Sequence, residues 1–326
     1  MAVGTDRTDV APSFGARIAD SIGRFVDSDV FYSFRRSPVT MAAFAVTVLL
    51  FALAIFAPWF APHNTSDVAS LNLMNARLPP YGFTDAFGTE GDSRFLLGTD
   101  DQGRDILSAI MFGLRVSLGV GFASVILAAV VGTALGLISA YIGGTLDSVI
   151  MRIADVQLTF PAILIALLID GIVGGLLPRA MQEEVKLYVL VLAIAASQWV
   201  NFARTVRGST LVEKSKEYVQ AAKVIGVHPA KIMVRHVLPN VTGPVLVIAT
   251  LSLAIAVLTE ATLSFLGVGV PVTHPSLGTL IRIGQQYLFS GEWWMTIFPS
   301  ISLVILVLAV NLLGDWLRDA LNPKLR

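Results

Sequence analysis

The amino-acid sequence predicts an all-α polytopic membrane protein with six transmembrane helices. Hydrophobic residues make up 55% of the 326 residues and charged residues only 14%, whereas soluble domains contain about 25% charged residues. Six apolar segments approach or exceed the roughly 20 helical residues that a bilayer core requires. The net charge of +0 gives no basic field for nucleic acid, and the absence of cysteines excludes disulfides and thiolate metal sites.

The N-terminal segment 1–38 is predicted to be cytoplasmic and to contain an amphipathic helix. Apolar residues recur in it at helical spacing, at Phe14, Ile18, Ile22 and Phe25. This pattern is typical of a helix that rests on the membrane surface. The first transmembrane helix is assigned to 39–61, which is longer than the apolar region of a cleaved signal peptide, about 7 to 15 residues.

Segment 62–110 is predicted to be an ordered periplasmic loop that caps the helices. It contains Asp100, Asp101 and Asp105, whose spacing is not that of an EF-hand calcium loop. A turn held by a salt bridge with Arg104 is therefore favoured over a metal site.

Segment 111–326 is predicted to be the main transmembrane domain and holds the other five spans. They are 116–142, 156–177, 187–203, 241–270 and 293–314. The pair Gly132 and Gly136 in the first of these has the small-xxx-small spacing that predicts close helix packing.

Six spans place both termini on the same side of the membrane. Lys and Arg residues number 16 on the side of the termini and 7 on the other side. The positive-inside rule therefore places both termini and the basic loop 204–239 in the cytoplasm.

The loop 204–239 is predicted to fold into a short helix, a turn and a second short helix. Ser215 suits the N-cap of the first helix, and Gly226 suits a left-handed C-cap. Pro229 suits the first position of the second helix, and Pro239 is predicted to end it.

One face of the first loop helix is predicted to carry Tyr218, Ala221, Ala222 and Ile225 at helical spacing. An interfacial helix anchored on lipid by lysines is the alternative. The small alanines favour docking into a groove of another protein.

The segment 220–239 resembles the EAA loop of ABC importer permeases, in which Glu-Ala-Ala is followed at fixed spacing by Gly, Ile and Leu-Pro. The spacing is retained, with Gln220 in place of the Glu and His236 in place of the Ile. Segments 96–108 and 258–269 and the C-terminal sequence resemble the dipeptide and oligopeptide permease family of ABC transporters.

The resemblance implies a type I ABC importer permease fold in the inner membrane of a bacterium. It implies these partners: a second six-span permease that forms a heterodimer, two cytoplasmic ATPase subunits, a periplasmic solute-binding protein and the lipid bilayer, with no nucleic acid and no cofactor. The solute would be a dipeptide, an oligopeptide or a related small molecule. The residues that would couple the permease to the ATPase are Glu217, Gln220, Ala221, Ala222, Gly226, Leu238 and Pro239.

The chain contains no G-x-x-x-x-G-K-[ST] sequence, so no phosphate-binding loop of that type is present. No catalytic residue or metal ligand is assigned, and ATP hydrolysis is expected of a partner subunit.

Polar residues inside spans are candidates for the translocation pathway, since an intramembrane polar group is costly and faces a cavity or a neighbouring helix. These candidates are Gln157, Gln198, Asn201, Glu260 and Asn311. Lining the pathway and bonding to neighbouring helices are equally compatible with the sequence. Glu260 and Asp170 also motivate an alternative function, a secondary transporter driven by an ion gradient, and a structural or signalling membrane protein is a third possibility.

Overall fold

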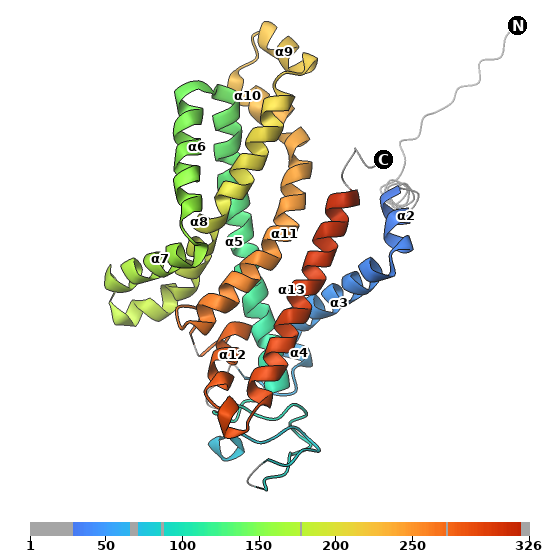
Figure 1. The fold of residues 1–326 in the computed structure, drawn as a ribbon, viewed down its shortest axis with the longest axis vertical. Helices are drawn as coiled ribbons and strands as arrows, with labels where there is room; N and C mark the ends of the chain where they lie inside the picture. Colours follow the sequence, from blue (N-terminus) through green and yellow to red (C-terminus); the bar gives the residue numbers. More distant parts are fainter. Residues whose placement is uncertain (1–28, 66–70, 86–87, 177, 272, 321–326) are drawn as a thin grey trace, which may run out of the picture.

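The computed structural model describes residues 29–65, 71–85, 88–176, 178–271 and 273–320. This part of the chain is helical, without a strand among the described residues (Figure 1). Five helices are long and apolar enough to cross a membrane, and one bent helix pair is a sixth candidate. The prediction of an all-α membrane protein is confirmed, with five spans and the bent pair as the candidate for the predicted sixth. The predicted amphipathic helix around residues 14–25 lies outside the described residues.

The first span is preceded by a short helix that reaches the end of the chain's last helix. Helix α2 (Asp29–Arg36) leads into α3 (Pro38–Ile55) and α4 (Ala57–Phe60). The Phe34 ring of α2 packs edge-on against Trp316 of α13 (Trp294–Ala320), with ring centroids 5.3 Å apart. The two termini of the described chain therefore lie at the same end of the bundle (Figure 1).

Helix α5 (Ile106–Ile142) begins inside the segment that was predicted to be loop. The Asp105 side chain accepts a hydrogen bond from the Ser108 backbone N–H at 3.0 Å. An aspartate in this position satisfies a free N–H group of the first turn and so favours helix initiation there. The predicted loop boundary at residue 110 is wrong for this reason.

The predicted third span, 156–177, is wrong as a single straight helix. The structure has α6 (Gly144–Thr159) and α7 (Ala162–Leu176), bent at 95° to one another. Phe160 at the break has an extended backbone, with ψ of 131°. Pro161 causes the break, because proline disfavours the helical conformation in the residue before it and lacks the N–H of a helix ladder.

Helices α5 and α8 (Arg179–Glu213) lie in close contact through two glycines. A Cβ atom added at Gly132 would lie 2.4 Å from the Trp199 carbonyl oxygen, and one added at Gly136 would lie 2.4 Å from that of Ala203. Because neither position has room for a side chain, the backbones approach directly. The predicted close packing through these glycines is confirmed.

The remaining helices complete the bundle and define its two ends. They are α11 (Leu238–Phe265), the short α12 (Leu277–Gln285) and α13. Helix α12 and the loop 71–105 lie at one end, and the helices of loop 204–239 lie at the other (Figure 1).

The loop 71–105 is ordered by buried polar contacts. Arg104 Nε lies 2.6 Å from Asp100 Oδ2, and both side chains are buried. The predicted salt-bridged turn is thereby confirmed. The Trp294 indole N–H donates to the Thr99 carbonyl at 3.2 Å, so this loop is joined to the start of α13.

Glu292, which precedes α13, gives a pH prediction for this end of the protein. Its side chain is buried beside Arg77, with Nη1 and Oε1 3.6 Å apart. Burial raises the pKa of Glu292, Arg77 opposes the rise and Asp85 adds to it. Because a raised folded-state pKa favours the protonated acid, this group's stabilising contribution is present below its ordinary pKa and is lost as pH rises through the folded-state pKa.

Substitution Glu292→Gln is expected to flatten the decline in thermal unfolding midpoint between pH 4.5 and pH 7. At pH 7 the variant should unfold about 2 °C or more above the unmodified protein. Glu90→Gln changes an exposed carboxylate in the neighbouring loop and serves as the control. A pH profile of Glu292→Gln that coincides with that of the unmodified protein would contradict the expectation.

Candidate functional site

The loop that connects α8 to α11 forms a compact helical hairpin at one end of the bundle. Its helices are α9 (Glu217–Val224) and α10 (Pro229–Ile232). Gly226 has φ of 78°, and the N–H of Val227 reaches the Ala222 carbonyl at 3.0 Å. This is the Schellman ending in which glycine tolerates the left-handed conformation at no steric cost. The predicted C-cap at Gly226 and the predicted helix start at Pro229 are confirmed.

Ser215 does not cap α9, contrary to the sequence prediction. The N-cap residue is Lys216, and the Ser215 hydroxyl donates back to the Val212 carbonyl at 2.7 Å. This local bond to the preceding turn competes with capping, as it commonly does for serine.

Pro239 does not end the second helix, which also corrects the sequence prediction. A five-residue π-helical turn (Met233–Val237) joins α10 to α11, and the Leu238 N–H bonds to the Met233 carbonyl. The wider turn accommodates the missing N–H of Pro239 within the first turn of α11. The loop and the span after it therefore form one continuous helical rod.

One side of α9 is buried against the chain itself. Val219 is 0% exposed and Ala222 is 5% exposed. They belong to a cluster that we call the loop core, made of Leu137, Val206, Val219, Ala222, Ile232, Val237 and Val241. The loop core joins the hairpin to α5, α8 and α11, so α9 is held on the bundle.

The other side of α9 is exposed. The Val224 side chain is 87% exposed and that of Ile225 is 77% exposed. Gln220 and Ala221 are exposed beside them. We call these four residues, Gln220, Ala221, Val224 and Ile225, the outer face of α9. The single face predicted from the sequence, which contained Ala221, Ala222 and Ile225, is therefore split. Ala222 points into the loop core, whereas Ala221 and Ile225 are exposed.

A polar network fixes α9 between the end of α8 and the start of α11. The Tyr218 hydroxyl donates to Glu213 and accepts from Asn240 Nδ2 at 2.9 Å. The same Asn240 amide donates to the His236 carbonyl at 2.7 Å. Burial raises the pKa of Tyr218, and the hydrogen bond to Glu213 adds to the rise. The network holds the orientation of α9 in addition to the apolar contacts of the loop core.

The replacement of glutamate by Gln220 has a structural consequence. The Gln220 side-chain amide donates to the Lys214 carbonyl at 2.8 Å. A glutamate carboxylate has no hydrogen to donate in that bond. The glutamine therefore ties the outer face of α9 to the segment that precedes it.

Ion pairs join the turn between α5 and α6 to α8, beside the loop core. Arg207 donates to both carboxylate oxygens of Asp147 at 2.7 Å, and Ser139 also donates to this carboxylate. Lys214 Nζ donates to the Ala140 carbonyl at 2.6 Å. A bidentate arginine and carboxylate pair fixes geometry better than a single contact does, so α8 is held in place against this turn.

The polar candidates inside the spans occupy separate positions. Gln157 accepts a hydrogen bond from the Trp199 indole at 2.7 Å and donates to the Ala196 carbonyl, which joins α6 to α8. Gln198 is 5% exposed, and neither of its amide atoms has a partner among the described residues. Asn201 is exposed and Asn311 is half-buried.

Glu260 is fully buried in α11, where it bonds to Ser117 and Ser264. Among the described residues no hydrogen bond joins any two of the five candidates. The structure therefore does not assemble them into one site.

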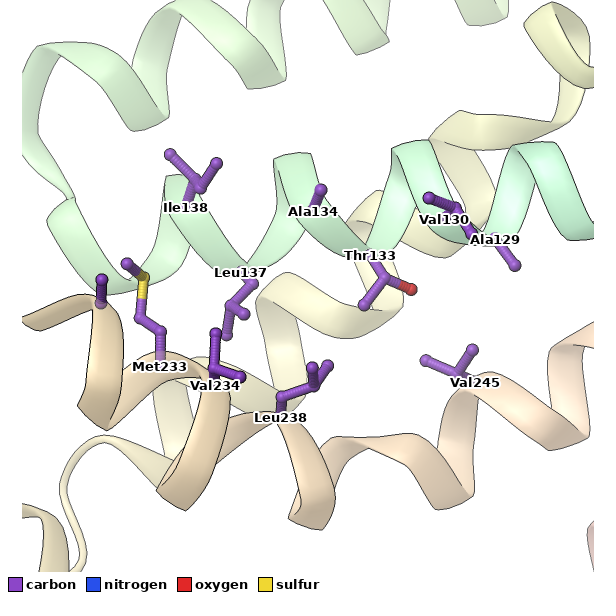
Figure 2. A pocket seen from close by; sticks show the side chains of 11 residues that line it. Ala129, Val130, Thr133, Ala134, Leu137, Ile138, Met233, Val234, Leu238 and Val245 are labelled. Carbon is purple, nitrogen blue, oxygen red and sulfur yellow. The ribbon is translucent and has the colours of Figure 1, made fainter.

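An apolar cavity of about 530 Å³ lies between α5 and the rod formed by α10 and α11 (Figure 2). Its wall includes Leu137 and Ala134 from α5 and Met233, Leu238 and Val245 from the rod. Thr133 is the one lining residue with a side-chain oxygen. No sequence pattern indicated this cavity, because it arises where two helices far apart in the chain diverge.

Comparisons with known proteins agree with this architecture. Residues 132–326 match the profile of the binding-protein-dependent transport system inner membrane component, and residues 28–80 match that of the N-terminal TM domain of oligopeptide transport permease C. The first match alone covers more than half of the chain, and it includes the whole of loop 204–239.

Relatives of similar length span nearly the entire chain. The dipeptide transport system permease protein DppC of Haemophilus influenzae is 36% identical over 91% of this chain and 95% of its own length. The oligopeptide transport system permease protein OppC of Bacillus subtilis is 36% identical over 91% and 90%. The glutathione transport system permease protein GsiD of Pectobacterium atrosepticum is 35% identical over 90% and 89%.

A solved structure shares the fold at lower sequence similarity. It is the MetNI methionine ABC transporter in inward-facing conformations, and the match has a TM-score of 0.52 at 20% identity. The match covers 67% of this chain and 98% of the compared chain.

Proposed function

The chain belongs to the family of inner-membrane permease components of binding-protein-dependent ABC transporters, and from that premise we propose that it carries a short peptide or a close peptide derivative. As a permease of this family it is a multi-pass inner-membrane protein that works with an ATPase and a solute-binding protein. The names of its relatives at 35–36% identity refer to dipeptides, oligopeptides and glutathione. All of these solutes contain amide bonds between amino acids, which supports a peptide solute.

The complete importer contains this chain, a second six-span permease of different sequence, two ATPase subunits and one solute-binding protein. The termini and loop 204–239 face the cytoplasm. This orientation is supported by the excess of Lys and Arg on that side and by the position of α2, α9 and the end of α13 at the same end of the bundle (Figure 1). Helix α12 and loop 71–105 then face the periplasm and the solute-binding protein.

Helix α9 is the contact through which the ATPase drives the permease. The observation that carries this assignment is its two-sided construction. Val219 and Ala222 anchor α9 in the loop core. Val224, the last residue of α9, and Ile225, its C-cap, are exposed on the opposite side. An exposed apolar face on a rigidly held helix is suited to a groove of a partner protein, and the loop core passes its movement to α5, α8 and α11.

The roles of the other predicted residues follow from their positions. Gly226 shapes the end of α9, and Leu238 and Pro239 continue the rod into α11. Glu217 lies in the first turn of α9, where the helix dipole stabilises a carboxylate. Of the candidates for the pathway, Gln157, Gln198, Asn201 and Asn311 are proposed to contact solute when the second permease completes the channel.

The decisive experiment is purification of the tagged chain from its native membranes, followed by mass spectrometry of the associated proteins. The proposal requires an ATPase, a second permease and a solute-binding protein in the sample. Liposomes that contain the purified assembly should take up labelled dipeptide only with binding protein and ATP present. Uptake by the chain alone in response to a proton or sodium gradient would instead establish the ion-driven alternative.

A further inference from the structure

The carboxyl group of Glu260 is the centre of a hydrogen-bonded joint between three helices. Its Oε2 atom accepts from the Ser117 hydroxyl of α5 at 2.7 Å. Its Oε1 atom accepts from the Ser264 hydroxyl, one turn further along α11, at 2.6 Å. All three side chains are buried, with Glu260 and Ser117 at 0% exposure. A buried carboxyl group within a span is costly unless it is bonded, so these contacts are required by its position.

Each of the two serines also accepts a hydrogen bond from the backbone. The Leu277 N–H donates to Ser117 Oγ at 3.3 Å, and the Val270 N–H donates to Ser264 Oγ at 3.3 Å. A serine hydroxyl has one hydrogen and two lone pairs, so it can donate to the carboxyl group and accept the amide together. Each carboxyl oxygen is therefore linked, through one hydroxyl, to one end of the segment that leads into α12.

Helix α12 lies in close backbone contact with the bundle. A Cβ atom at Gly278 would lie 2.3 Å from the Ala261 carbonyl oxygen, and one at Gly113 would lie 3.2 Å from the Leu277 nitrogen. Within α12, Ser276 caps the helix by accepting from the Thr279 N–H at 3.2 Å. Small residues thus bring α12 against α5 and α11, and the Glu260 joint fixes its entry.

We propose that Glu260 is a positioning residue that, through Ser117 and Ser264, locks the entry of α12 onto α5 and α11. Helix α12 then follows these two helices whenever they move. The inference rests on the proposed function only where it assigns α12, at the periplasmic end of the bundle, to the gate that opens and closes the pathway there. The joint itself is a property of this chain and can be measured without any partner.

The test uses the absence of cysteines in the chain. Leu280→Cys places a single thiol on α12 at a position that is 5% exposed. The full chain is placed in lipid nanodiscs. The rate of maleimide labelling then reports how often α12 separates from α5 and α11 and exposes the thiol. Glu260→Ala in this background should increase the rate about tenfold or more, since the buried hydrogen bonds of the carboxyl group are lost.

Further variants separate the joint from a general loss of folding. Ser117→Ala and Ser264→Ala each break one of the two links and should accelerate labelling less than Glu260→Ala does. Glu260→Gln keeps one carbonyl acceptor and should give an intermediate rate. Thr262→Ala is the control, because this hydroxyl donates to the Leu258 carbonyl of its own helix. Its loss should leave the labelling rate unchanged.

Labelling rates equal to those of the reporter protein in Ser117→Ala, Ser264→Ala and Glu260→Ala would overturn the inference. If Glu260→Ala does not fold, the two serine variants decide. In the assembled transporter, Ser117→Ala should lower peptide uptake per ATP hydrolysed while ATP hydrolysis continues. A transporter that retains its uptake while labelling accelerates would separate α12 from the gate, and the joint would stand independently of the proposed function.

Discussion

Replacement of Gly136 by leucine is expected to eliminate the folded protein from the membrane. A side chain at this position would meet the carbonyl group and Cα of Ala203, with the nearest atom at 2.4 Å, so α5 and α8 would have to separate. Overpacking in a tight core costs about 1 to 3 kcal/mol, and more where backbone must move. Total stabilities are about 5 to 15 kcal/mol, and losses of about 1 to 2 kcal/mol already change the amount of protein in cells several-fold, so separating α5 from α8 should leave little folded protein. Fluorescence-detected size-exclusion chromatography of a tagged chain measures this amount.

Gly119→Leu is the matched control for this prediction. It lies on the same helix, and no atom lies within 4 Å of a Cβ added there. Both substitutions change helix propensity and hydrophobicity alike, so only the packing differs. If the two variants gave equal amounts of monodisperse protein, the direct contact between α5 and α8 would not be required for folding.

The double substitution Val224→Asp and Ile225→Asp is expected to release the ATPase from a permease that is still folded. Both side chains are largely exposed, so the loop core remains intact. Burying an unpaired carboxylate against an apolar partner surface costs several kcal/mol, so affinity should fall by about 100-fold or more. Co-purification of the ATPase and ATP-driven uptake should be lost together.

Phe289→Asp is the control for the outer face of α9. Phe289 is 97% exposed and lies just after α12 in the chain, and α12 is at the opposite end of the bundle from α9 (Figure 1), so the charge is added without a change at α9. The ATPase should remain bound to this variant. An ATPase that stays with the double variant to the same extent would exclude the outer face of α9 as its docking surface.

Ala222→Asp should behave differently from the double substitution. Ala222 lies in the loop core, so the new charge would be buried and would loosen the whole hairpin.

Sequence periodicity placed Ala222 beside Ala221 and Ile225 on one face. It could not show which edge of that face meets α5 and α8, because helical spacing fixes angles around an axis and not the direction in which the helix is turned.

The sequence by itself determined the features that depend on neighbouring residues. Span lengths follow from runs of apolar residues, and the ending of α9 follows from Gly226, since only the local backbone has to accept φ of 78°. The spacing of loop 220–239 was also sufficient to indicate the family. The break at Pro161 is local too, because proline disfavours the helical conformation in Phe160, the residue before it.

The tertiary structure alone decided which polar groups find partners. Ser117 and Glu260 are 143 residues apart, and Ser117 and Leu277 are 160 residues apart. A composition or a period cannot report such pairings, because they depend on which helices pack together and at what depth. The same holds for the cavity between α5 and the rod, and for the side of α9 that remains exposed. Local residue chemistry thus specified the helices, whereas contacts between distant segments specified what their polar side chains do.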